Sequence, residues 1–288
     1  MEVTWQAKVR SEASLLGGGL ALWGLVSSCA FSHPDAASQA RMLVDKGRSR
    51  EAAAQLEAYL QRQPGAVKER RLLIRVYATL GQLDRSQQHA QALAQELGPN
   101  SPVPWVELGY AFELSHRYDE AIEQYDRAAL SAPSDPLGPL TGGLRAARWG
   151  EAQLAEPRLV EGLRRDARNA EAWHALGLVR VRLGDLDGAS AAYRSGLRAD
   201  PQALEDHMGL ATLALLRGDA AAALGEYDII AQARPKFADA ELGRAWALMK
   251  LGRLDDAQRA LDRAQELGAS ARPLAAQRRA LEALRPVH

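Results

Sequence analysis

The sequence has no excess of charge of either sign and only one cysteine. Of its 288 residues, 36 are Lys or Arg and 36 are Asp or Glu, which gives a net charge of zero at pH 7. Nucleic-acid-binding proteins normally carry a basic excess concentrated on one face. We therefore expect no nucleic-acid partner. A single cysteine excludes a disulfide within the chain, so stability must come from non-covalent packing.

The sequence also lacks the short motifs of common enzyme classes. It contains no P-loop glycine pattern, no H-E-x-x-H, no G-x-S-x-G and no cysteine-histidine metal spacing. Among its six histidines, His174 and His207 are the pair most worth testing as metal ligands. We interpret both as ordinary packed or solvent-facing side chains. The sequence predicts no enzymatic activity, no cofactor, no metal site and no small-molecule substrate.

A spacing of 34 residues recurs through most of the chain. One column holds Gly47, Gly81, Gly150, Gly184, Gly218 and Gly252, with His116 in the same place after a one-residue slip. A column of alanines precedes a column of Leu or Tyr by four residues: Ala52, Ala121, Ala155, Ala189, Ala223 and Ala257, then Leu56, Tyr125, Leu159, Tyr193, Tyr227 and Leu261. Residues four apart share one helix face, and glycine often ends a helix. The period predicts stacked helix-turn-helix units that bury their apolar faces against one another.

These columns resemble the tetratricopeptide repeat, whose pattern is W-x2-L-G-x2-Y, then A-x3-F, then P. The clearest copy comprises Trp105, Leu108-Gly109, Ala121, Tyr125 and Pro133, and the next comprises Trp173, Leu176-Gly177, Ala189, Tyr193 and Pro201. The resemblance implies an all-α fold, a right-handed superhelical solenoid of about seven units. We place the units at 33–66, 67–101, 102–135, 136–169, 170–203, 204–237 and 238–271, with the array proper over 39–271. Residues 272–288 are expected to form a capping helix and tail.

The fourth unit departs most from the pattern. Pro139 stands at the tryptophan position, Gly142-Gly143 replace Leu-Gly, and Pro157 falls inside the second helix. A proline in a helix interior costs about 3 kcal/mol or more. We therefore expect this helix to begin late or to kink, with a bend between the third and fifth units.

The amino terminus resembles a lipoprotein signal. Lys8 and Arg10 precede an apolar run over 15–26, which is shorter than the roughly 20 residues that span a bilayer. The segment Val26-Ser27-Ser28-Cys29 resembles a bacterial lipobox. The resemblance implies a signal peptide over 1–28, a lipid on Cys29 and a short linker over 29–38. A permanent membrane anchor and a buried thiol at Cys29 are the alternatives. Because no aspartate follows Cys29, the resemblance favours the periplasmic face of the bacterial outer membrane.

In this repeat family, the first helix of each unit lines the inner surface. The early units supply basic residues at the corresponding places, and the later units supply a mostly apolar stripe. The candidate groove comprises Arg71, Arg75, Val106, Tyr110, Leu140, Leu144, His174, Leu178, Met208, Thr212, Leu215, Trp246 and Met249. An exposed apolar patch of this kind suits an amphipathic helix or an extended peptide. Burial of the stripe between neighbouring units is the alternative.

The combination of a lipobox and a repeat array resembles lipoproteins of pilus assembly, including those of Tad-type systems and the pilotins of type IV pilus secretins. It implies a non-enzymatic scaffold that binds a protein or peptide client, such as a secretin, a pilus-assembly component or another cell-envelope component. An envelope-maintenance scaffold that docks peptidoglycan enzymes or aids outer-membrane protein assembly is the alternative.

Overall fold

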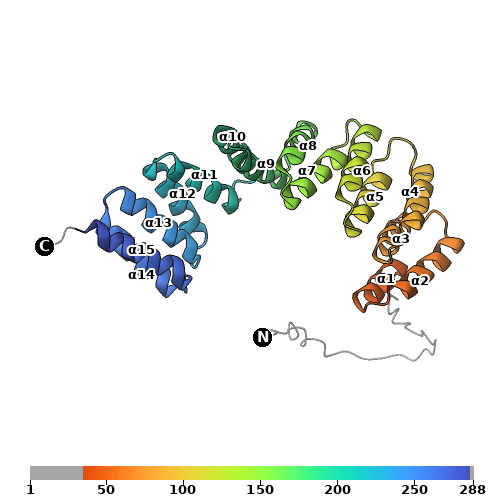
Figure 1. The fold of residues 1–288 in the computed structure, drawn as a ribbon, viewed down its shortest axis with the longest axis horizontal. Helices are drawn as coiled ribbons and strands as arrows, with labels where there is room; N and C mark the ends of the chain where they lie inside the picture. Colours follow the sequence, from red (N-terminus) through yellow and green to blue (C-terminus); the bar gives the residue numbers. More distant parts are fainter. Residues whose placement is uncertain (1–34, 286–288) are drawn as a thin grey trace, which may run out of the picture. The chain divides into compact units, whose positions relative to one another are not determined.

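The computed structural model describes residues 35–285, which form fifteen α-helices and no strands (Figure 1). The first helices of the successive pairs are α1 (Ala36–Asp45), α3 (Val67–Thr79), α5 (Val103–Leu114), α7 (Leu137–Trp149), α9 (Ala170–Leu183), α11 (Leu204–Leu216) and α13 (Ala238–Lys250). The second helices are α2 (Ser49–Arg62), α4 (Leu83–Leu97), α6 (Tyr118–Ser131), α8 (Ala152–Arg165), α10 (Leu186–Ala199), α12 (Ala220–Ala233) and α14 (Leu254–Glu266). A last helix, α15 (Ala271–Leu284), follows. The all-α fold predicted from the repeat spacing is confirmed.

Each pair of helices falls within one of the seven predicted units. The first helix begins at Ala36, earlier than residue 39, where the array was placed. The expected capping helix is present as α15, which packs on α13 and α14 through Leu274 and Leu281. These two leucines are buried, whereas most of the helix is exposed, as expected for a cap with a polar outer face.

A left-handed residue separates the two helices of each pair. All six glycines of the repeated column have a positive φ, between 71° and 92°. His116 occupies this place between α5 and α6 with φ 59°, and it is the non-glycine residue with positive φ in the described part of the chain. The turn conformation is therefore kept even where glycine is absent.

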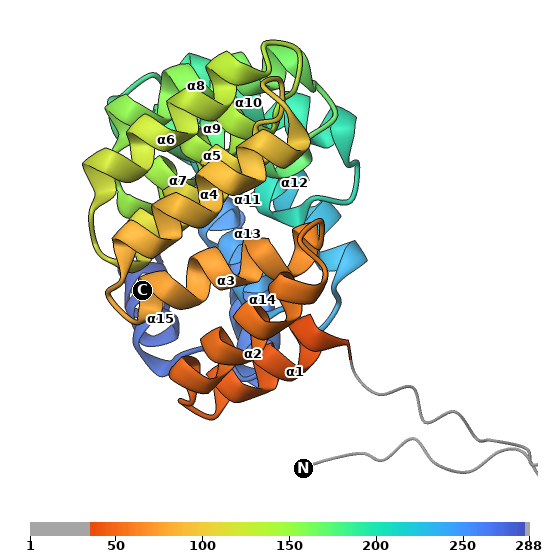
Figure 2. The same ribbon diagram turned by 90° about the vertical axis from the view of Figure 1, so that its right-hand side faces the viewer.

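Successive helices pack on their neighbours along the whole described chain. Each second helix contacts the first helix of its own pair and the first helix of the next pair. First helices also contact one another directly, as in α3 with α5, α7 with α9 and α9 with α11. Both views show α1, α2 and α3 side by side (Figures 1 and 2). This arrangement places the first helices next to one another and lets them share a surface.

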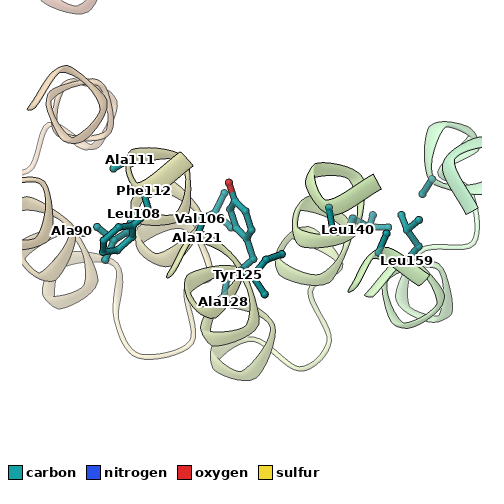
Figure 3. Packing of buried hydrophobic residues seen from close by; sticks show 14 of the residues in the cluster. Ala90, Val106, Leu108, Ala111, Phe112, Ala121, Tyr125, Ala128, Leu140 and Leu159 are labelled. Atoms are coloured by element: carbon teal, nitrogen blue, oxygen red, sulfur yellow. The ribbon is translucent and has the colours of Figure 1, made fainter. Parts of the chain in front are cut away.

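Small residues against large ones bring the helices of a pair together. Every member of the alanine column is fully buried, and Ser86 fills its place in the second pair, where its hydroxyl donates to the carbonyl of Ile74 at 2.8 Å. Tyr125 lies between α5 and α7 (Figure 3). A Cβ on Gly109 would lie 2.4 Å from its ring, so only glycine fits beneath it. Gly177 stands in the same relation to Tyr193.

The fourth pair is built like the others. Helix α8 is continuous from Ala152 to Arg165 with Pro157 in its interior, so the expected late start of this helix is wrong. In α7, Gly143 lets Leu159 approach closely, since a Cβ there would lie 2.8 Å from the Leu159 backbone nitrogen. The glycines that replace Leu-Gly thus serve close packing of α7 on α8. The bend between the third and fifth units stays a prediction.

None of the helices between residues 35 and 285 has the length and apolar character needed to cross a membrane. The predicted signal peptide, Cys29 and most of the predicted linker lie outside the described residues. The lipid anchor and the outer-membrane location therefore stay predictions.

Candidate functional site

Four of the predicted groove residues line one depression on the first helices. Tyr110 of α5, Leu144 of α7, and His174 and Leu178 of α9 border a space of about 530 Å³. The rest of its lining comprises Thr141, Arg145, Ala147, Arg148, Glu171, Ala175, Val179 and Arg182. We call this depression the inner groove. Leu178 is 48% exposed and Leu144 is half-buried, so the apolar floor is open to solvent.

Three of the predicted groove residues belong to the hydrophobic core instead. Val106, Leu140 and Met249 are only 2%, 7% and 5% exposed. Leu140 fills the space over Gly162 of α8, where a Cβ would lie 2.4 Å from its Cδ2. Met249 packs in the cluster of α13, α14 and α15, and Val106 packs in that of α5 and its neighbours. These residues contact adjacent helices and line no open surface.

The remaining carboxyl-terminal residues lie apart from the inner groove. Met208 and Leu215 are half-buried, and the exposed Thr212 donates its hydroxyl to the carbonyl of Met208 at 2.9 Å. Trp246 is 36% exposed, and the ammonium of Lys250 lies 5.1 Å from its ring centre. Residues of α11 and α13 do not border the depression formed by α5, α7 and α9.

The two predicted basic residues of α3 are held by one buried carboxylate. Arg71 Nε lies 2.8 Å from Glu107 Oε1, and Arg75 Nε lies 2.5 Å from Glu107 Oε2. Glu107 is fully buried. Burial alone would lower the pKa of Arg75, but the hydrogen bond and charge of Glu107 raise it overall. These arginines join α3 to α5, so part of their charge is already neutralised within the protein.

Tyr110 lies between two guanidinium groups at one end of the inner groove. The Arg75 and Arg145 guanidinium carbons lie 4.5 and 5.5 Å from its ring centre. Arg145 in turn donates to Glu113, with Nε 2.7 Å from Oε2. Tyr125 also donates to Glu113, at 3.3 Å, and burial followed by the charge of Glu113 raises the pKa of Tyr125. This network fixes the Tyr110 ring as a rigid wall.

The histidine pair proposed as metal ligands is used in two separate hydrogen bonds. His174 Nδ1 lies 2.7 Å from Asp206 Oδ1, and His207 Nδ1 lies 2.6 Å from Glu226 Oε2. In the described part of the chain, no three His, Cys, Asp or Glu side chains gather as metal ligands would. Both histidines therefore connect helices, α9 to α11 and α11 to α12.

The sequence reasoning missed the charged members of the inner groove. Arg148 and Arg182 end α7 and α9, and they lie 34 residues apart in the sequence. Glu171 opens α9, and Glu205 stands 34 residues later at the start of α11. The same period that revealed the glycine column contains these charges, at the two ends of the first helices.

Comparison with known proteins agrees with this geometry. The sequence model described as tetratricopeptide repeat matches residues 38–102, 140–203, 174–237 and 208–272, which together make up more than half of the chain. One curated relative, Protein bimA of Emericella nidulans, is 28% identical over 95 residues, or 33% of this chain. The aligned segment spans only 12% of that protein.

Several solved structures share the fold at low sequence identity. A TPR repeat-containing protein from Cytophaga hutchinsonii is 14% identical with a TM-score of 0.64, and the match covers 84% of this chain and 98% of that one. PilF of Pseudomonas aeruginosa is 17% identical with a TM-score of 0.55, covering 76% and 99%. MamA is 19% identical with a TM-score of 0.55, covering 58% and 91%. These likenesses concern the fold alone, whereas the sequence match extends over most of the units. The chain therefore belongs to the tetratricopeptide repeat family.

Proposed function

We propose that this protein is a non-enzymatic scaffold whose inner groove binds a protein client. The observation that carries this proposal is the open apolar floor of the groove. Leu178 is 48% exposed on a helix whose neighbouring residues Leu176 and Val179 are each 1% exposed. Apolar side chains left open in a concave site are typical of surfaces that bind other proteins. Tetratricopeptide repeats generally act as such scaffolds.

The cellular setting is part of the same proposal. The lipobox-like segment Val26-Ser27-Ser28-Cys29 supports a lipid on Cys29 and a place on the periplasmic face of the outer membrane. A lipobox followed by a tetratricopeptide array also resembles pilus-assembly lipoproteins. The array further shares its fold with PilF. The scaffold would assist assembly of a pilus or secretion machine by holding a client near the membrane.

The groove is tested by changing its floor without disturbing the core. Leu144→Asp together with Leu178→Asp should abolish capture of clients from solubilised membranes while leaving the helical content unchanged. Leu130→Asp is the matched control, because Leu130 is 80% exposed on α6, outside the groove. Retained capture by the double variant would contradict the groove, and lost helicity would mean that both leucines serve as core.

The anchor is tested separately with Cys29→Ser. Without the thiol no thioether can form, so the variant should leave the membrane fraction while its repeats stay folded. A variant that remains fully membrane-bound would contradict lipidation. The proteins captured with the wild type then separate pilus or secretin components from the alternative, enzymes of peptidoglycan metabolism.

A further inference from the structure

The inner groove has charges of opposite sign along its two edges. On α9, Glu171, His174, Leu178 and Arg182 follow one another at helical spacing, and all four border the groove. Glu171 lies in the first turn of this helix and Arg182 in the last. At 1.5 Å per residue, the two positions are separated by about 16 Å along the helix axis. The apolar floor at Leu178 lies between them.

The same polarity extends to the two neighbouring first helices. Arg148 ends α7 beside Arg182, and Glu205 opens α11 beside Glu171. Helix α9 packs against both α7 and α11, so each pair of like charges lies along one edge. We call Arg148 and Arg182 the basic rim, and Glu171 and Glu205 the acidic rim.

The four rim charges lack counter-ions. Within residues 35–285, none of them forms an ion pair with another side chain, whereas Arg145 and Arg180 close by pair with Glu113 and Glu156. Apart from Arg182, whose guanidinium donates to the carbonyl of Ala147 at 3.4 Å, they make no hydrogen bond through their side chains. The helix dipoles favour carboxylates at amino ends and cations at carboxyl ends, which accounts for the signs. It leaves the rims free to bind complementary charges.

From these rims we infer that the groove fixes the direction in which a client helix lies. The inference rests on the proposed function. An α-helix with its side chains is about 10–12 Å wide, which fits between rims about 16 Å apart. The matching client is an amphipathic helix whose apolar stripe is flanked by carboxylates on one side and by Lys or Arg on the other. Turning such a helix end for end exchanges its flanks and brings like charges together at both rims.

Two synthetic peptides of about 18 residues, or five helical turns, test the direction. The first has a Leu stripe, a Glu flank and a Lys flank, and the second has the two flanks exchanged. Each carries a photo-crosslinker at its amino terminus and is bound to the full chain in detergent. We expect one peptide to crosslink at the α5 end of the groove and the other at the α11 end. Because exposed ion pairs are individually weak, the preference should be about tenfold, and it should decline between about 50 and 500 mM salt.

A charge exchange in the protein gives the complementary test. The variant with Arg148→Glu, Arg182→Glu, Glu171→Arg and Glu205→Arg keeps the net charge and should reverse the crosslinked end for both peptides. Arg48→Glu with Glu51→Arg is the matched control, since this exposed pair on α2 lies outside the groove and should change nothing. Circular dichroism establishes that both variants are folded.

The outcomes separate this inference from the proposed function. Binding of both peptides with crosslinks at the same end, or at both ends equally, would overturn the directional role and leave the groove as a binding site. Absence of binding by either peptide would also overturn the inference. In that case the capture experiment with the Leu144 and Leu178 variants decides the proposed function independently.

Discussion

The guanidinium of Arg75 in α3 donates to both carboxylate oxygens of Glu107 in α5, with Nε 2.5 Å from Oε2 and Nη2 3.0 Å from Oε1. Glu107 is fully buried, and Arg71 is its second partner. Two half-exposed cations thus satisfy one carboxylate at the junction of the second and third units. The basic residues that the sequence suggested as a client-binding patch are first of all a connection between repeats.

Removing both arginines should therefore destabilise the protein strongly. The double variant Arg71→Ala and Arg75→Ala leaves a buried carboxylate without a cation, which costs about 3–5 kcal/mol. Either single change should cost clearly less, because one arginine remains. Urea unfolding followed by circular dichroism measures the difference. Arg148→Ala is the control and should stay within about 0.5 kcal/mol of wild type, because this arginine has no ion-pair partner. A double variant as stable as this control would refute the role of Glu107.

The second prediction concerns His174 and Asp206, which join α9 to α11. Asp206 is fully buried, its Oδ1 is bonded to His174, and its Oδ2 has no hydrogen-bond partner. His174→Ala should reduce the free energy of unfolding by about 1–3 kcal/mol, because the carboxylate loses its side-chain donor. Adding Asp206→Asn removes the buried charge, so the double variant should lose less than the sum of the single changes. Strict additivity in this double-mutant cycle would show that the two residues do not interact.

A third prediction uses the glycines that lie beneath tyrosine rings. A Cβ on Gly177 would lie 2.3 Å from Tyr193 Cε1, so Gly177→Ala forces the ring or the helix to shift. Such overpacking costs about 1–3 kcal/mol, which outweighs the roughly 1 kcal/mol that alanine gains in a helix. Gly225→Ala in α12 is the matched control, because its Cβ would meet no atom within 4 Å, and it should stabilise the protein. Thermal unfolding distinguishes the two. A stabilised Gly177 variant would contradict this packing.

The fourth prediction concerns pH and His89, which stacks on Tyr77 with ring centres 5.5 Å apart. Burial, and then the charge of Arg70, lowers the pKa of His89 below its ordinary value of 6.5. The folded protein thus binds this proton less readily than the unfolded chain. Its contribution to stability is complete above the ordinary pKa and is lost as the pH falls through the lowered value. His89→Phe should lose less stability than wild type between about pH 7.5 and pH 5.5, measured by urea unfolding. Identical losses would contradict the prediction.

The sequence determined the helices because each unit repeats the same local pattern. The 34-residue spacing placed the turn at Gly47, Gly184 and their equivalents, and these residues have the positive φ that such a turn requires. The alanine column is fully buried because a small residue is needed wherever two helices approach closely. The interruption of the pattern at Pro157 was misleading, because packing of α8 on its neighbours outweighs the propensity of one residue.

The candidate site was predictable only in part, because exposure depends on the adjacent repeats. Leu140 and Leu144 are both apolar residues on α7, yet Leu140 is buried against Gly162 while Leu144 borders the inner groove. The periodicity cannot distinguish them, since both lie on the same helix face. The buried partner of Arg75 likewise lies 32 residues away, at a distance along the chain that no local pattern covers.

By itself, the sequence determined that this chain is a stack of helix pairs in the tetratricopeptide family, because each unit carries its own turn and packing residues. Only the tertiary structure decided which apolar positions stay open, which charges are neutralised and where opposed charges face one another. Those properties arise between repeats, where side chains far apart in sequence share one surface and compete for the same space and the same counter-ions.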